Sequence, residues 1–252
     1  MESEALKGRF SEDDHYFHQN YLTDQQADDD AAEILGLLNL SPGARILDVG
    51  CGDGRLSVRL AALGFAVVGL DADAEQLKRA KVRRLPSSAS IEWRLGDAAE
   101  LAEAESFDAV FCWFNSLGFG SEDHHQRVLD ALCSVLRPGG TLVIDTLDAN
   151  GLSEVLGGDA EPVRLAVGED YQVDRAHFEE ASGRLVVERT MVRNGQYSER
   201  VLSVQLFSAE RWAQEFESRE VLLESATGRA GIPLEEGEGV LVLVGRKRQG
   251  LR

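Results

Sequence analysis

The sequence predicts an α/β protein with a doubly wound, mostly parallel (Rossmann-like), seven-stranded sheet and an inserted antiparallel β subdomain. Short apolar strands alternate with amphipathic helical segments between residues 45 and 145, and the alternation stops after Asn150. Strands that alternate with helices are typical of parallel βαβ units. Strands that follow one another without crossover helices pair antiparallel.

The first half of the chain begins with a helix. Thr23 and Gln26 have the spacing of a capping box, and Ser41-Pro42-Gly43 ends the helix. Apolar runs then predict strands, and apolar residues three or four apart predict the helices between them. The expected strands are residues 45–49, 66–70, 91–95, 109–113 and 141–145. One expected helix has Leu56 on its apolar face, and two others begin at Asp73 and Ser121.

Beyond Asn150 the pattern changes to strands alone. Residues from about 162 to 207 look like antiparallel strands, and Asn194-Gly195 has the composition of a hairpin turn. A helix from Ser208 through Phe216 and strands at 221–224 and 240–244 complete the main sheet. The expected organisation is an N-terminal helical lid (1–40), a ligand-binding core (41–150), an inserted antiparallel sheet (151–207) and a closing helix with two strands (208–252).

Composition excludes several classes of function. The 252 residues carry 26 Lys and Arg against 44 Asp and Glu, and this net charge of −18 disfavours nucleic acid as a partner. There is no run of about 18 uncharged apolar residues and no apolar signal at the N-terminus, so neither a membrane span nor secretion is expected. Three scattered cysteines form neither a disulfide framework nor a metal-ligand spacing. We therefore expect a cytoplasmic protein without a metal site.

The chemistry is concentrated in the turn after the first strand. Asp48-Val49-Gly50-Cys51-Gly52-Asp53-Gly54 opens a helix, and its glycines let the backbone turn sharply and approach a ligand. Asp71 ends the second strand, 19 residues after Gly52, where a carboxylate accepts hydrogen bonds from both hydroxyl groups of a ribose. Together they predict a site for a nucleoside-containing cofactor.

A dinucleotide is the less favoured cofactor. Its G-x-G-x-x-G fingerprint, counted from Gly50, requires a third glycine at position 55, where the chain has Arg55. The third glycine comes early, at Gly54. An NAD-dependent oxidoreductase is therefore an alternative with weaker support, and a purely structural glycine turn is another.

Five motifs lie in order between Ile46 and Ile144. They are Leu47 to Gly54, Gly69-Leu70-Asp71, Gly96-Asp97-Ala98, Phe107-Asp108-Ala109-Val110 and Leu136-Arg137-Pro138-Gly139-Gly140. Together they resemble the class I S-adenosylmethionine-dependent methyltransferases. The resemblance implies S-adenosyl-L-methionine as the cofactor, S-adenosyl-L-homocysteine as its product, and residues 41–150 as the cofactor-binding core.

The resemblance also implies a role for each motif. The glycine turn holds the methionine portion, and Asp71 with Ala72 holds the ribose. Asp97 and Ala98 approach the adenine, and the end of the fourth strand faces the sulfonium and the transferred methyl group. The implied cofactor contacts in this core are Asp48, Gly50, Cys51, Gly52, Gly54, Asp71, Ala72, Asp97, Ala98, Trp113 and Phe114.

The segment from Trp113 to Phe119 is similar to glycine N-methyltransferase-like and sugar N-methyltransferase-like enzymes, which also carry an antiparallel insertion. That likeness implies that Asn115 contacts the substrate. Tyr16 and Tyr21 look like the aromatic lid of actinobacterial small-molecule relatives. The lid implies cofactor contacts for both tyrosines and a catalytic role for Tyr21 beside Asn115, with core packing as the alternative.

We therefore expect methyl transfer to a small molecule or short peptide, most simply at nitrogen. Oxygen and carbon acceptors are alternatives, as is a non-catalytic domain that binds S-adenosylmethionine or S-adenosylhomocysteine. The inserted sheet is expected to cover the cleft or to form a homodimer. His124 and His125 open the helix after Ser121 and are expected to be exposed to solvent.

Overall fold

The main sheet has seven strands in the order β10-β11-β5-β4-β1-β2-β3. The computed structural model describes residues 11–156, 161–234 and 239–250. Strands β1 to β5 run parallel, and β11 runs antiparallel to both β5 and β10, so the predicted sheet is confirmed. The strands are β1 (Arg45–Val49), β2 (Ala66–Asp71), β3 (Ile91–Leu95), β4 (Phe107–Cys112), β5 (Leu136–Leu147), β10 (Val221–Thr227) and β11 (Val240–Lys247).

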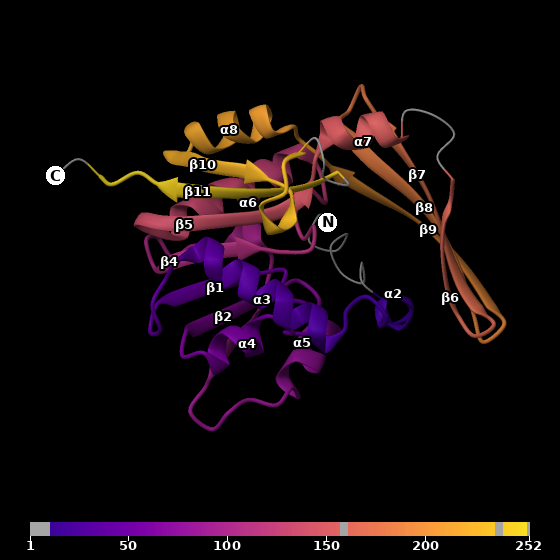
Figure 1. Cartoon of the computed structure of the whole chain (residues 1–252), viewed down its shortest axis with the longest axis horizontal. Coiled ribbons are helices and arrows are strands. Elements are labelled where there is room, and N and C mark those ends of the chain that lie inside the picture. The colour runs from indigo at the N-terminus through magenta and orange to yellow at the C-terminus, as the bar shows by residue number, and fades with distance from the viewer. Residues whose placement is uncertain (1–10, 157–160, 235–238, 251–252) are drawn as a thin grey trace.

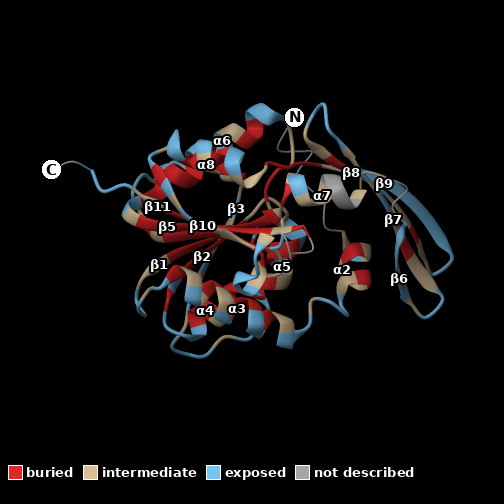
Figure 2. Ribbon diagram, turned by 45° about the horizontal axis from the view of Figure 1, so that its top comes forward, coloured by how far each residue is buried: buried red, intermediate tan, exposed pale blue. Residues whose placement is uncertain are grey.

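Helices cover both faces of this sheet. Figures 1 and 2 show α3 and α4 on one face and α6 and α8 on the other. Ile46 of β1 belongs to the apolar core shared with α3 and α4, whereas Leu47 belongs to the core shared with α6 and α8. This alternation requires strands that are apolar on both faces. The helices around the sheet are α3 (Asp24–Leu38), α4 (Ser57–Ala62), α5 (Ala74–Lys81), α6 (Glu122–Val135), α8 (Ala209–Glu217) and the short 3₁₀ turns η1 (Ala98–Glu100) and η2 (Arg229–Gly231).

A second, four-stranded sheet stands beside the first (Figure 1). Its strands are antiparallel, in the order β6-β7-β8-β9, as the sequence predicts. Asn194 and Gly195 have φ of 50° and 71° and join paired residues, so the predicted hairpin turn is confirmed. The inserted strands are β6 (Val163–Val167), β7 (Asp170–Glu179), β8 (Arg184–Arg193) and β9 (Gln196–Gln205), preceded by the helix α7 (Ala149–Leu156), which the sequence pattern does not predict.

The N-terminal helix α2 (Glu12–His18) docks on the inserted sheet through charge. Ser11 caps the helix, and Asp14 completes a capping box with it. The Asp14 carboxylate is fully buried, where it pairs with Arg189 at 2.5 Å and also with Arg200. Because both arginines come from the second sheet, Asp14 fixes α2 over the carboxyl end of the main sheet.

His124 and His125 correct one expectation. They are 3% and 1% exposed, not solvent-facing as predicted. The first turn of α6 is enclosed because His124 contacts Asp97 at the end of β3, while His125 packs edge-on against Phe207 and Trp212. Helical periodicity does not reveal this burial, since all three neighbours come from elsewhere in the chain.

No helix in the described ranges is both long and apolar enough to cross a membrane.

Replacing Asp14 by Ala should loosen α2 from the inserted sheet. The change removes the buried carboxylate that joins Arg189 and Arg200 to α2, and breaking a buried ion pair costs about 3–5 kcal/mol. Asp13→Ala is the matched control, because its pair with Arg193 is partly exposed and contributes at most about 1 kcal/mol. Urea unfolding and limited proteolysis between α2 and α3 measure the effect. Equal behaviour of the two variants would contradict this account of docking.

Candidate active site

A cavity of about 660 Å³ lies at the carboxyl ends of β1 to β5. This edge is where open α/β sheets bind ligands, and the volume is typical of small-molecule sites. His15 and His18 of α2 line the cavity, as do Arg189 and Leu202 of the inserted sheet. The N-terminal helix and the insertion therefore add walls that the main sheet alone would lack.

The glycine-rich turn after β1 lies at one side of this cavity. Gly50, Gly52 and Gly54 have φ of 69°, 56° and 77°, a left-handed conformation that favours glycine. A Cβ at Gly50 would lie 2.6 Å from Cβ of Ser116, and one at Gly54 would lie 2.4 Å from the Trp93 ring. A Cβ at Gly52 would meet no atom within 4 Å. Close packing thus requires glycine at 50 and 54, whereas Gly52 leaves its backbone open to a ligand.

Asp71 ties the end of β2 to the glycine turn. Its Oδ2 accepts a hydrogen bond from the Gly52 N–H at 2.7 Å, and its Oδ1 accepts one from the Asp73 N–H at 2.8 Å. Burial raises the pKa of the Asp71 carboxyl. These two bonds fix the orientation of the carboxylate at the cavity wall.

Asp48 lies deeper, at the end of β1. It is 2% exposed, and its Oδ2 accepts a hydrogen bond from the Ser57 hydroxyl at 2.5 Å. Burial raises the pKa of the Asp48 carboxyl to about 7. This group therefore changes its charge near neutral pH, directly at the cavity.

Asp97, after β3, is held from two sides. Its Oδ1 accepts a hydrogen bond from the Ala99 N–H at 2.9 Å. Nε2 of His124 lies 2.8 Å from Oδ2 and 3.0 Å from Oδ1 of the same carboxylate. Asp97, Ala98 and His124 all line the cavity.

Two consecutive left-handed residues follow β4. Phe114 and Asn115 have φ of 61° and 53°, a strained conformation that the surrounding structure must support. Asp145 of β5 supports it, because its Oδ2 accepts from the Phe114 N–H at 2.6 Å and its backbone oxygen accepts from the Asn115 N–H at 3.2 Å. Asn115 lines the cavity, and its Oδ1 accepts a hydrogen bond from the Thr146 hydroxyl at 3.2 Å.

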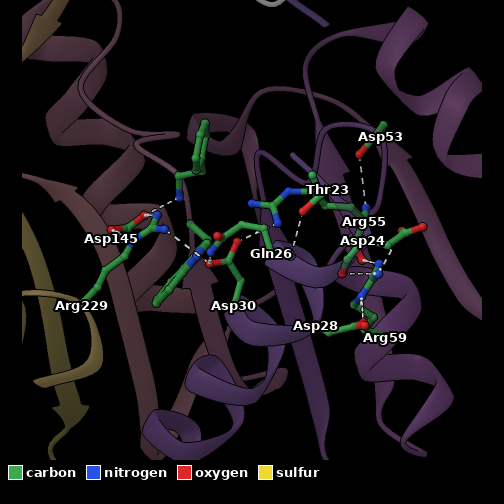
Figure 3. A network of polar contacts seen from close by, with 12 residues as sticks. Thr23, Asp24, Gln26, Asp28, Asp30, Asp53, Arg55, Arg59, Asp145 and Arg229 are labelled. Atoms are coloured by element: carbon green, nitrogen blue, oxygen red, sulfur yellow. Dashed lines mark hydrogen bonds and ion pairs between the residues drawn. The ribbon is translucent and has the colours of Figure 1, made fainter. Parts of the chain in front are cut away.

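Arginines from two other elements close a network around this turn (Figure 3). Arg229 of η2 donates to Asp145 at 2.6 Å and reaches Asp30 of α3 at 3.4 Å. Arg55 pairs with the same Asp30 at 2.7 Å. The guanidinium groups of Arg55 and Arg229 lie 5.5 and 5.7 Å from the centroid of the Phe114 ring.

Sequence reasoning missed Arg229. The residue lies in a short turn between β10 and β11, in a segment without periodicity or motif, so no signal in the sequence could have found it. Arg55 stands out in the sequence only as the residue in place of a fingerprint glycine. In the structure it is 8% exposed and ion-paired.

Most of the predicted site residues gather at the cavity. The lining includes Asp48, Gly50, Cys51, Gly52, Asp71, Ala72, Asp97, Ala98, Trp113, Phe114 and Asn115. Gly54 packs against Trp93 behind the turn and is not part of the lining. Tyr16 and Tyr21 do not line the cavity either: the Tyr16 hydroxyl donates to Asp170 at 2.9 Å, and Tyr21 is 57% exposed.

The histidines of α2 face the cavity instead of these tyrosines. Burial lowers the pKa of His15 and lowers that of His18 to about 4, so His18 is neutral at pH 7. Across the residues that the structure describes, no group of three or more His, Cys, Asp or Glu side chains could hold a metal ion.

Residues 46–140 match a protein family described as "Methyltransferase domain". A ubiquinone biosynthesis O-methyltransferase from Xanthomonas campestris is 40% identical over 109 residues, which cover 42% of this chain and 44% of that protein. Glycine N-methyltransferase from Rattus norvegicus is 35% identical over 128 residues, which cover 45% and 44%. The match thus spans less than half the length of these curated relatives.

Solved structures agree over nearly the whole chain. An S-adenosylmethionine-dependent methyltransferase from Clostridium acetobutylicum has a TM-score of 0.77 at 17% identity, and the alignment covers 95% of this chain and 99% of that protein. The CcbJ methyltransferase from Streptomyces caelestis has a TM-score of 0.76 at 16% identity, covering 98% of both chains. A sugar N-methyltransferase from Streptoalloteichus has a TM-score of 0.70 at 19% identity, covering 94% and 92%.

Residues 46–140 thus match a methyltransferase domain, and the chain has the fold of solved S-adenosylmethionine-dependent methyltransferases. The resemblance drawn from the five motifs is confirmed at that level.

The carboxyl of Asp48 should make stability depend on pH. Its pKa is about 7 in the folded protein and near 4 in an unfolded chain. Its contribution to the free energy of unfolding is therefore fully present below about pH 4 and is lost as the pH rises through about 7. The stability of Asp48→Asn relative to wild type should therefore increase from about pH 5 to about pH 8. Urea unfolding measures this difference, with the surface change Asp130→Asn as control. A difference that is independent of pH would contradict the assignment.

Proposed function

We propose that this protein is an S-adenosylmethionine-dependent methyltransferase that transfers a methyl group to a small molecule or short peptide. The observation that carries the proposal is the bond between Asp71 and the open backbone of Gly52. It places a fixed carboxylate beside a glycine turn that a ligand can approach, at the ligand-binding edge of a methyltransferase domain.

The cofactor would extend along the carboxyl ends of β1, β2 and β3. The turn with Asp48, Gly50, Cys51 and Gly52 would hold its methionine portion, and Asp71 with Ala72 its ribose. Asp97 and Ala98 would meet its adenine. Trp113 and Phe114 offer aromatic side chains on the side of β4, and aromatic faces attract a sulfonium cation.

The chain itself needs to supply little covalent chemistry. Bound S-adenosylmethionine provides an activated methyl group on a charged sulfonium. The protein's part is to orient the acceptor and to exclude water, and good orientation contributes on the order of 7–11 kcal/mol in intramolecular models. The walls from the N-terminal segment and the inserted sheet supply that exclusion, with Leu22 and Leu202 among their apolar side chains.

Nitrogen is the acceptor atom that we propose. An amine must lose its ammonium proton before it attacks, and a partly apolar cavity favours the neutral amine over the ammonium ion. The Asn115 amide, held by Thr146, is placed to orient such a group through a hydrogen bond. The relatives named above include both an oxygen and a nitrogen methyltransferase, so the test must separate the two acceptors.

We also propose that the N-terminal segment covers the cavity, but with other residues than the predicted tyrosines. His15, His18 and Leu22 line the cavity, and Tyr16 acts indirectly by binding α2 to Asp170 of the inserted sheet. Tyr21 is next to Leu22 in the chain, but it is 57% exposed and does not line the cavity formed by the described residues, so we propose no catalytic role for it.

Asp71→Ala should weaken cofactor binding strongly. The variant loses both the acceptor for the ribose hydroxyls and the restraint on the glycine turn, and hydrogen bonds to a charged group contribute about 1.5–3 kcal/mol each. Calorimetric titration with S-adenosylhomocysteine should give micromolar binding for wild type and a loss on the order of 100-fold for the variant. Asp130→Asn, on the exposed side of α6, should bind as wild type does. Absence of binding by folded wild-type protein would refute the proposed function.

Asn115→Gly should impair catalysis without weakening cofactor binding. Glycine tolerates the left-handed backbone at this position, so the change removes only the amide. With a substrate found by screening matched amine and hydroxyl compounds, kcat/KM should fall on the order of 100-fold, because misplaced acceptors react slowly. The affinity for S-adenosylhomocysteine should stay unchanged. Methyl transfer to the hydroxyl compounds alone would overturn the nitrogen assignment.

A homodimer through the inserted sheet is the remaining part of the proposal. Strands β6 and β9 are its edges, and they expose Val163, Tyr197 and Val201, each above 60%. Light scattering should give twice the 27.6 kDa mass of one chain, and Val201→Glu should halve it. A monomeric wild-type protein would refute this assembly.

A further inference from the structure

His124 forms a buried pair with Asp97 at the cavity wall. The two side chains are 4% and 7% exposed, and Nε2 of His124 lies within 3.0 Å of both carboxylate oxygens. The pair connects the first turn of α6 to the end of β3. Both residues line the cavity, so the Asp97 carboxylate can accept hydrogen bonds from a ligand as well as from the protein.

The imidazole of His124 is held rigidly. Its Nδ1 lies 3.3 Å from the backbone oxygen of Phe119. Gly120, with φ of 84°, leaves just enough room for the ring, because a Cβ at this position would lie 2.9 Å from Nδ1. The ring is thus fixed by contacts at both nitrogens.

Stability alone does not account for such a pair. Removing a charged carboxylate and a histidine from water costs several kcal/mol, and apolar residues of similar volume usually serve stability as well or better. The neighbouring His125 shows that this helix turn accommodates a buried imidazole without any partner among the described residues: neither of its ring nitrogens has a hydrogen bond. The pairing of His124 with Asp97 therefore indicates that His124 serves to orient the Asp97 carboxylate.

We propose that His124 is the positioning residue that fixes Asp97 to select an adenine base over a 6-oxopurine. The inference rests on the proposed function, in which Asp97 meets the adenine of the cofactor.

The carboxylate of Asp97 has a free acceptor position for this task. A carboxylate offers about four acceptor positions, and the Ala99 N–H and the His124 ring occupy up to three of them. The exocyclic amino group of adenine donates to the position that remains. A 6-oxopurine presents a carbonyl oxygen there, which leaves the carboxylate without a donor and brings two acceptors together. Without His124 the carboxylate is free to turn, and the penalty on the oxo base falls.

The test compares the affinities of two ligands, S-adenosylhomocysteine and S-inosylhomocysteine, which differ at that exocyclic group. Wild type should bind the adenosyl compound at least about tenfold more tightly. His124→Leu should reduce the ratio to below about threefold, because the penalty on the inosyl compound falls when the carboxylate can turn. His124→Gln, whose amide can donate to Asp97, should restore most of the ratio. His125→Leu, a buried neighbour without a hydrogen-bond partner, is the matched control and should keep the wild-type ratio.

Each outcome decides the point, with circular dichroism used to verify folding. If wild type binds both compounds equally, or if His124→Leu keeps the full ratio, the inference is overturned while the cofactor site stands. If wild type binds neither compound, the proposed function fails as well. If His124→Leu does not fold, two other variants decide the point. A ratio in His124→Gln that is reduced from wild type yet above threefold supports the inference. An unchanged ratio in a folded Asp97→Asn variant overturns it.

Discussion

Carboxylates at the ends of parallel strands hold the ligand edge of this protein together. The loops that leave the sheet there have backbone N–H groups without helical or sheet partners, and such groups require acceptors. Asp71 accepts from Gly52 and Asp73, Asp97 accepts from Ala99, and Asp145 accepts from Phe114. The loops after β1, β2 and β4 are thereby fixed by a strand before or beside them, and the loop after β3 is fixed by its own Asp97.

This arrangement places several negative charges close together in a chain that already carries −18. Buried carboxylates are stable only when donors or opposite charges surround them. Arginines from distant elements meet that need at Asp30 and Asp145, and the inserted sheet meets it at Asp14. The arginines of the cavity wall are therefore tied to structural carboxylates. At Asp97 a histidine takes the place of an arginine, and the carboxylate faces the cavity.

The sequence predicts both sheets because the signals for them are local. Apolar runs, glycine turns and capping residues depend on neighbours in the chain, and the Asn194-Gly195 hairpin is fixed by two residues. The five motifs likewise lie at the ends of strands, which topology brings to one edge.

Interactions between segments that lie far apart in the sequence could not be predicted from these local signals. The burial of His124 depends on Asp97, which lies 27 residues away, and the role of Arg229 depends on Asp145, 84 residues away. The position of Tyr16 depends on Asp170 of the inserted sheet, 154 residues further on. Which face of α2 meets the cavity is decided by these contacts, because the helix alone is too short to show a clear apolar side.

The contacts of η2 also bear on how the chain acquires its structure. Arg229 and Ala230 bind Asp30 and Glu33 of α3, partners that lie 199 and 197 residues earlier in the chain. During synthesis the N-terminal elements emerge first and begin to fold before the rest exists. The nascent core therefore carries Asp30 and Asp145 without Arg229 until the last strands are made. A chain that ended before Arg229 would lack both β11, which joins β10 to β5, and the arginine that pairs with Asp145 beside the turn after β4.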